Sequence, residues 1–132
     1  MRRALRGKRA CDAAPPTLAP PPLAAPLTAC REGILNPTLV ITGTEAVATF
    51  GVKPGYQIDV TLRTYQKGAT FLPQTVVDDA QGTFGPGSHT LRARLPGAPD
   101  QGDLYCGLWP TEDLTAANFP AYDAQILAWV WR

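Results

Sequence analysis

Residues Tyr56–Tyr65 read YQIDVTLRTY and decide the fold class. Apolar and polar side chains alternate along them, which is the period of a β-strand with two different faces. Antiparallel sheets commonly have one face on the core and one in water, so we expect this segment to be a strand of such a sheet. The apolar face holds Ile58, Val60 and Leu62, and the face expected in solvent holds Gln57, Asp59, Thr61 and Arg63.

A predicted hairpin precedes this strand. Thr38–Thr42 is rich in β-branched residues, and Gly43-Thr44 then signals a tight turn before Glu45–Val52 returns as the hairpin partner. Lys53-Pro54-Gly55 fits a type II turn, with proline and glycine at its two central positions.

The rest of the chain repeats this pattern of short strands and turns. The 12 glycines and 14 prolines are too many for a helical bundle but suit strands joined by turns. The sequence therefore predicts a small all-β, antiparallel β-sandwich of about seven strands, either immunoglobulin-like or jelly-roll-like, over residues 34–132. The further segments are an edge strand at Thr70–Val77 interrupted by Pro73, a glycine-rich loop at Gln81–Gly87, strands at His89–Leu95, Leu104–Trp109 and Ala124–Arg132, a turn at Pro96–Asp103, and a long loop at Thr111–Tyr122 with a helical turn at Glu112–Ala117.

Residues 1–33 differ from this body in charge and composition. They carry six basic residues against two acidic ones, whereas residues 34–132 carry six against nine. Six prolines lie in Ala13–Thr28, and they disfavour both a helix and a central strand. We expect an extended, basic N-terminal arm that contacts an acidic protein surface or, as the less favoured alternative, nucleic acid. The arm residues expected to bind a partner are Arg2, Arg3, Arg6, Lys8 and Arg9.

The three cysteines are few and odd in number, which fits a reducing compartment. Cys11 and Cys30 could form a disulfide that closes a loop within the arm. Cys106 is interpreted as a small buried apolar residue. Leu27–Cys30 resembles a lipoprotein cleavage motif, but the segment before it contains Asp12 and six prolines instead of an apolar signal core. The expectation is therefore an uncleaved arm and no export.

Catalytic residue types are scarce. The chain has one serine and one histidine, the neighbours Ser88 and His89, and side chains of neighbouring strand residues point to opposite faces. One histidine and three scattered cysteines do not make a zinc site, no phosphate-binding loop occurs, and the apolar runs are too short to span a bilayer. We expect a protein without enzymatic activity, cofactor, metal or membrane span.

The last predicted strand carries two tryptophans. Trp129 and Trp131 share one face, and by parity Ile126, Ala128 and Val130 share the other. Aromatic residues at such a position are typical of a core or a subunit interface, and alternatively they form a platform for sugar rings, to which Trp109 would add. Trp129 and Trp131 are therefore candidate partner-binding residues.

A basic, proline-rich arm on a small β body resembles the accessory virion proteins of tailed phages, the class that decorates or cements capsids. The resemblance covers the whole chain as a pattern of composition. It implies a β-sandwich on a capsid lattice, trimers as the favoured homo-oligomer, the major capsid protein as partner and the virion as location. The alternative function is a carbohydrate-binding or adhesion module that uses exposed tryptophans.

Overall fold

The structure, a computed structural model, describes residues 27–132. The arm residues before Leu27, including Arg2, Arg3, Arg6, Lys8 and Arg9, lie outside the described residues. The described elements are α1 (Leu27–Gly33), β1 (Ile34–Thr42), β2 (Glu45–Val52), β3 (Ile58–Lys67), β4 (Gln74–Phe84), β5 (Gly87–Arg94), β6 (Asp100–Cys106), α2 (Phe119–Ala124) and β7 (Ile126–Trp131).

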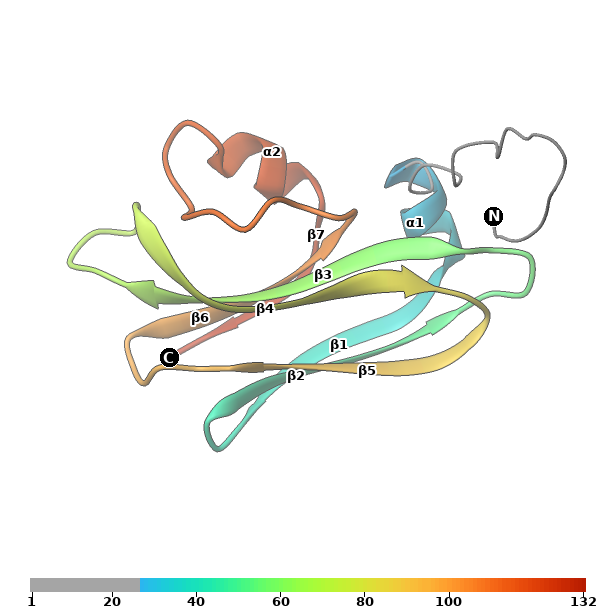
Figure 1. The fold of residues 1–132 in the computed structure, drawn as a ribbon, viewed down its shortest axis with the longest axis horizontal. Coiled ribbons are helices and arrows are strands. Elements are labelled where there is room, and N and C mark those ends of the chain that lie inside the picture. The colour runs from blue at the N-terminus through green and yellow to red at the C-terminus, as the bar shows by residue number, and fades with distance from the viewer. Residues whose placement is uncertain (1–26) are drawn as a thin grey trace, which may run out of the picture.

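Seven strands form two antiparallel sheets, which confirms the predicted β-sandwich (Figure 1). One sheet has the order β1-β2-β5 and the other the order β4-β3-β6-β7. Strands that are distant in sequence are therefore neighbours in space, as β2 is of β5 and β3 of β6. The chain therefore crosses repeatedly from one sheet to the other. This connectivity is the Greek-key arrangement of an immunoglobulin-like sandwich rather than that of an eight-stranded jelly roll.

The first two turns form as the sequence predicted. The β1–β2 hairpin turns at Gly43, whose φ of 60° is a left-handed conformation that glycine adopts without steric cost. Gly55 has a φ of 87°, and the amide of Tyr56 donates to the carbonyl of Lys53 at 3.2 Å, as a type II turn requires. These turns set the register of β1 against β2 and the direction in which β3 starts.

The main core lies between the two sheets. Ile58, Val60 and Leu62 of β3 are fully buried there, as their alternation predicted. From β5, Ala93 is buried, and Leu95 just beyond that strand is buried as well. Apolar burial of this kind is the main free-energy gain that holds a small sandwich together.

The other face of β3 is not exposed to solvent, so the expected wet face is wrong for three of its four residues. Asp59, Thr61 and Arg63 are at most 1% exposed, and only Gln57 lies in solvent. The cause is the cover on this face: α2 and the segment before it lie across the outer face of the four-stranded sheet (Figure 1). The hydroxyl of Thr61, for example, donates to the carbonyl of Gly107 at 2.7 Å. Sequence alternation alone does not reveal that a later segment covers a polar face.

Some boundaries also differ from the expectation. β4 lies at a sheet edge, as predicted, but begins after Pro73 and continues to Phe84 through the expected glycine-rich loop. β6 begins at Asp100 and includes residues expected in a turn. The helical turn of the last loop lies at Phe119–Ala124 rather than at Glu112–Ala117. No helix in the described part of the chain is long and apolar enough to cross a membrane.

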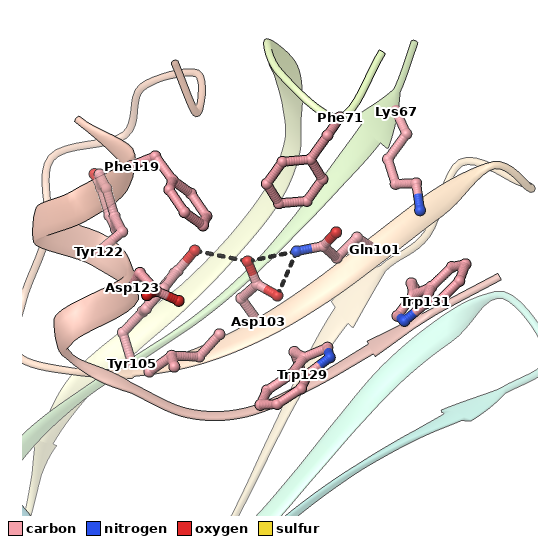
Figure 2. A pocket seen from close by; sticks show the side chains of 11 residues that line it. Lys67, Phe71, Gln101, Asp103, Tyr105, Phe119, Tyr122, Asp123, Trp129 and Trp131 are labelled. Carbon is pink, nitrogen blue, oxygen red and sulfur yellow. Dashed lines mark hydrogen bonds between the residues drawn. The ribbon is translucent and has the colours of Figure 1, made fainter. Parts of the chain in front are cut away.

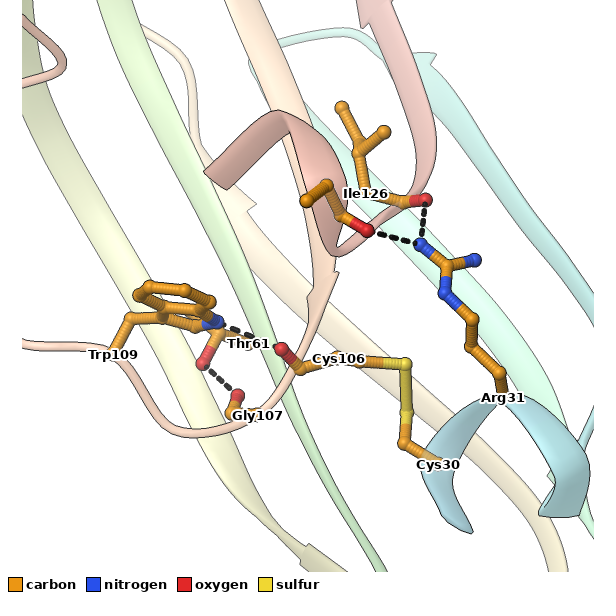
Figure 3. The surroundings of a disulfide bond; sticks show 8 residues. Cys30, Arg31, Thr61, Cys106, Gly107, Trp109 and Ile126 are labelled. Atoms are coloured by element: carbon orange, nitrogen blue, oxygen red, sulfur yellow. Dashed lines mark hydrogen bonds between the residues drawn. A yellow bond between two sulfur atoms is a disulfide. The ribbon is translucent and has the colours of Figure 1, made fainter. Parts of the chain in front are cut away.

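The last residues of the predicted arm belong to the described domain. Leu27–Gly33 forms α1, and Cys30 within it is 1% exposed and disulfide-bonded to Cys106 at the end of β6 (Figure 3). The alternative pairing of Cys30 with Cys11 is therefore wrong. Cys106 is buried in the main core, as predicted, but it is disulfide-bonded rather than a free thiol. A disulfide also does not fit the reducing compartment expected from the number of cysteines. Arg31 adds a second attachment, since its guanidinium donates to the carbonyls of Ala124 and Ile126 at 2.9 and 3.1 Å.

Candidate ligand-binding pocket

Trp129 and Trp131 lie on one face of β7, as predicted, and are 61% and 62% exposed. The neighbouring assignment of Ile126 to the opposite face is wrong. The register shifts between Leu104 paired with Ala128 and Tyr105 paired with Ile126, so Leu127 is an extra residue in β7. Such a bulge reverses the alternation beyond it. It turns Ile126 to the side of the two tryptophans, whereas Ala128 packs against the main core.

A pocket of about 330 Å³ opens beside these tryptophans on the outer face of the four-stranded sheet (Figure 2). Alternate residues of β6 form its floor because side chains two apart on a strand point the same way. Residues from β7, α2 and the β3–β4 loop form its walls. The lining consists of Lys67, Phe71, Gln101, Asp103, Tyr105, Phe119, Tyr122, Asp123, Ile126, Trp129 and Trp131.

The floor is a polar network around a buried carboxylate. Asp103 is 2% exposed, and its two oxygens accept hydrogen bonds from Nε2 of Gln101 at 2.8 and 2.9 Å. The hydroxyl of Tyr105 donates to the same carboxylate at 2.7 Å and lies 3.1 Å from the hydroxyl of Tyr65. Nε2 of Gln74 in turn donates to Oε1 of Gln101 at 3.2 Å. The network holds Asp103 in one orientation.

Burial changes the acidity of this network. It raises the pKa of Asp103 to about 6, even though the hydrogen bonds from Tyr105 and Gln101 favour the ionised form. Burial and the neighbouring charge of Asp103 raise the pKa of Tyr105 far above its ordinary value, so its hydroxyl stays protonated and remains a donor. A carboxyl group that titrates near neutral pH in a pocket is a common property of binding and catalytic sites.

The mouth of the pocket combines a cation with aromatic rings. Nζ of Lys67, at the end of β3, lies 4.2 Å from the ring centroid of Trp131, within the range of a cation–π contact. On the opposite wall Phe71 and Phe119 pack edge to face, with centroids 5.3 Å apart. Asp123 of α2 is exposed at the rim. The mouth therefore offers apolar ring faces and charges of both signs.

A buried arginine supports the wall formed by α2. Nε of Arg63 donates to Asp79 at 3.1 Å, and its two terminal nitrogens donate to the hydroxyl of Tyr122 and the carbonyl of Trp109. Burial alone would lower the pKa of Arg63, but the hydrogen bond and charge of Asp79 outweigh burial and raise it. The guanidinium thus stays charged and joins β3, β4 and α2 beneath the pocket.

Several residues considered from the sequence lie elsewhere. Trp109 does not line the pocket, because its Nε1 donates to the carbonyl of Cys106 at 2.7 Å. His89 packs against the rings of Phe50 and Phe84, and its Nε2 lies 2.7 Å from the carbonyl of Gly85. Among the described residues no group of three His, Cys, Asp or Glu side chains is arranged to hold a metal ion.

The sequence did not indicate Gln101 and Asp103 as floor residues, because both lie in the turn predicted at Pro96–Asp103, whereas Tyr105 lies in the strand predicted at Leu104–Trp109. The alternation of Gln101, Asp103 and Tyr105 with intervening residues is itself a strand signal. Together with the tryptophan-bearing strand it would have indicated a polar floor beside an aromatic wall. No protein-family model, curated protein or solved structure matches this chain, so its function is argued from the pocket alone.

Proposed function

We propose that this domain is a carbohydrate-binding module without catalytic activity. The observation that carries the proposal is the pair of exposed indoles, Trp129 and Trp131, at the rim of a pocket with a polar floor. Two tryptophans that are more than half exposed on one strand face leave a large apolar area in water, which is typical of a binding surface.

The pair is spaced as a platform for sugars. Residues two apart on a strand are separated by about 7 Å, so adjacent indoles present successive flat, apolar surfaces along β7. The C–H faces of sugar rings stack on such surfaces, whereas sugar hydroxyls need hydrogen-bonding groups close by. Lys67 and Asp123 at the rim supply those groups, in keeping with the usual composition of ligand pockets.

A glycan array followed by calorimetry with the best glycan tests this function. Trp129→Ala and Trp131→Ala should each weaken binding at least tenfold while circular dichroism and thermal unfolding stay unchanged. Leu108→Ala removes a comparably exposed apolar side chain that does not line the pocket, and it should bind as the unchanged protein does. Absence of glycan binding, or binding that survives both tryptophan substitutions, would reject the proposal.

A second candidate is the structural role expected from the sequence, an accessory protein that decorates or cements a virion. The position of the tryptophans favours it, since β7 is an edge strand of its sheet and such edges commonly pair with another chain. In this role Trp129 and Trp131 contact a neighbouring copy or the major capsid protein, and the basic arm contacts further subunits. Native mass spectrometry separates the two roles, because only the structural role predicts that Trp129→Ala disrupts a trimer or the attachment to a particle.

A further inference from the structure

The carboxylate at the pocket floor lacks a positive partner. Asp103 is almost fully buried, and no ion pair to it occurs within residues 27–132. Asp100, on the same strand and equally buried, is paired with Arg132 at 2.9 Å. Buried charges in proteins are normally paired, so an ionised Asp103 is a site that a cation would stabilise.

The walls of the pocket are also suited to a cation. Aromatic side chains of β6, β7, α2 and the β3–β4 loop line the pocket together with Asp103 (Figure 2), and the face of an aromatic ring attracts positive charge. The protein itself illustrates this attraction, since the ammonium of Lys67 lies over Trp131 at the mouth. With Asp103 ionised, the lining carries two carboxylates against the one ammonium of Lys67, so the pocket has a net negative charge.

We propose that this pocket binds a ligand group that carries a protonated amine. The inference rests on the proposed carbohydrate-binding function and narrows its ligand class to amino sugars with a free ammonium group. The ammonium lies among the aromatic rings above Asp103, while the sugar ring stacks on Trp129 at the rim.

Because the charge of the pocket floor changes with pH, the affinity for a cation should also depend on pH. The titratable and charged groups that face Asp103 are Tyr105 from its own strand, Arg63 and Lys67 from β3, and Tyr122 and Asp123 from α2, with Tyr65 behind Tyr105. Arg63 lies directly opposite Asp103 in the register of β3 and β6, but its guanidinium is ion-paired with Asp79. Of these groups Asp103 has the pKa of about 6, so its charge is present at pH 7.5 and largely lost at pH 5. A permanent cation should therefore bind more tightly as pH rises through 6.

Choline tests the site with a charge that does not titrate. Calorimetric titration of the full chain with choline chloride from pH 5 to 8 should show affinity rising about tenfold or more across this range. Asp103→Asn should weaken binding at pH 7.5 and flatten the profile. Lys67→Gln should strengthen binding, because it removes a competing ammonium from Trp131, and a purely structural role of Lys67 would not produce that gain. If Asp103→Asn does not fold, the profile of the unchanged protein and the Lys67→Gln variant still decide the outcome.

Oligosaccharides that share one linkage then distinguish a failure of this inference from a failure of the proposed function. The probes are β-1,4-linked tetramers of glucosamine, N-acetylglucosamine and glucose at pH 6.5. Preference for the glucosamine tetramer by tenfold or more supports both proposals. Equal binding of all three tetramers overturns the amine specificity but keeps the carbohydrate-binding function. Choline binding without any sugar binding supports the cation site and rejects the carbohydrate function, whereas failure of choline and of every sugar overturns both.

Discussion

Cys30 in α1 and Cys106 at the end of β6 are joined by a disulfide although 76 residues separate them in sequence. The bond attaches α1 to the end of β6, a central strand of the four-stranded sheet, next to the segment that covers the outer face of β3. It thereby connects the start of the described domain to the strand that carries the floor of the pocket.

Loss of this disulfide should lower stability substantially. In the loop-entropy model, closing a loop of this length raises the free energy of the unfolded chain by about 4.5 kcal/mol. The double variant Cys30→Ala/Cys106→Ala should therefore unfold at lower denaturant concentration in non-reducing buffer. Dithiothreitol should destabilise the unchanged protein and leave the double variant unaffected. Equal stability of the unchanged protein with and without reductant would contradict the prediction.

The titration of Asp103 should make stability depend on pH. Its pKa is raised from 3.8 to about 6, so the fold disfavours the ionised form, and the resulting stabilisation is present below pH 4 and lost as pH rises through 6. The loss amounts to about 3 kcal/mol at neutral pH for a shift of this size. Urea unfolding of Asp103→Asn at several pH values should show that this dependence has disappeared.

Glu32→Gln is the matched control for that experiment, because Glu32 is exposed and does not line the pocket. Its pH dependence between 4 and 7 should follow that of the unchanged protein. A common slope for all three proteins would show that Asp103 does not titrate with a raised pKa.

The buried arginine beneath the pocket should be costly to replace. Arg63→Met leaves Asp79, whose side chain is 17% exposed, without its ion-pair partner. Removing one member of a buried pair costs about 3–5 kcal/mol, and the partial exposure of Asp79 places the expected loss at the low end, about 3 kcal/mol. Arg92→Met is the control, since Arg92 pairs with Glu45 on the surface and both side chains are well exposed. Exposed pairs contribute about 0–1 kcal/mol, so denaturant unfolding should distinguish the two variants clearly. Similar losses in both would contradict the proposed importance of the buried pair.

The junction of α1 with β1 should not tolerate a side chain. A Cβ atom at Gly33 would lie 2.6 Å from the ring of Tyr56, so Gly33→Ala should displace that ring at a cost of about 1–3 kcal/mol. Gly68→Ala adds the same atom where nothing lies within 4 Å, and it should leave the unfolding free energy nearly unchanged. In a Tyr56→Ala background the effect of Gly33→Ala should shrink, and a thermal or denaturant double-mutant cycle measures this coupling.

Part of the pocket was predictable from local pattern. The shared face of Trp129 and Trp131 follows from their spacing, because the strand continues without irregularity between them. The position of Ile126 was not predictable in this way, since it depends on a bulge that arises only when β7 pairs with β6. The burial of Asp103 at the pocket floor likewise depends on aromatic residues that come from other parts of the chain.

The amino-acid sequence by itself determined the strand content, the first two turns and the apolar face of β3, because alternation and turn chemistry act between residues that are near one another in the chain. Only the tertiary structure decided that Cys30 bonds to Cys106, that the polar face of β3 is buried and that a carboxylate lies at the floor of an aromatic pocket. Those features depend on contacts between residues dozens of positions apart, and local pattern carries no information about which distant segment will supply the partner.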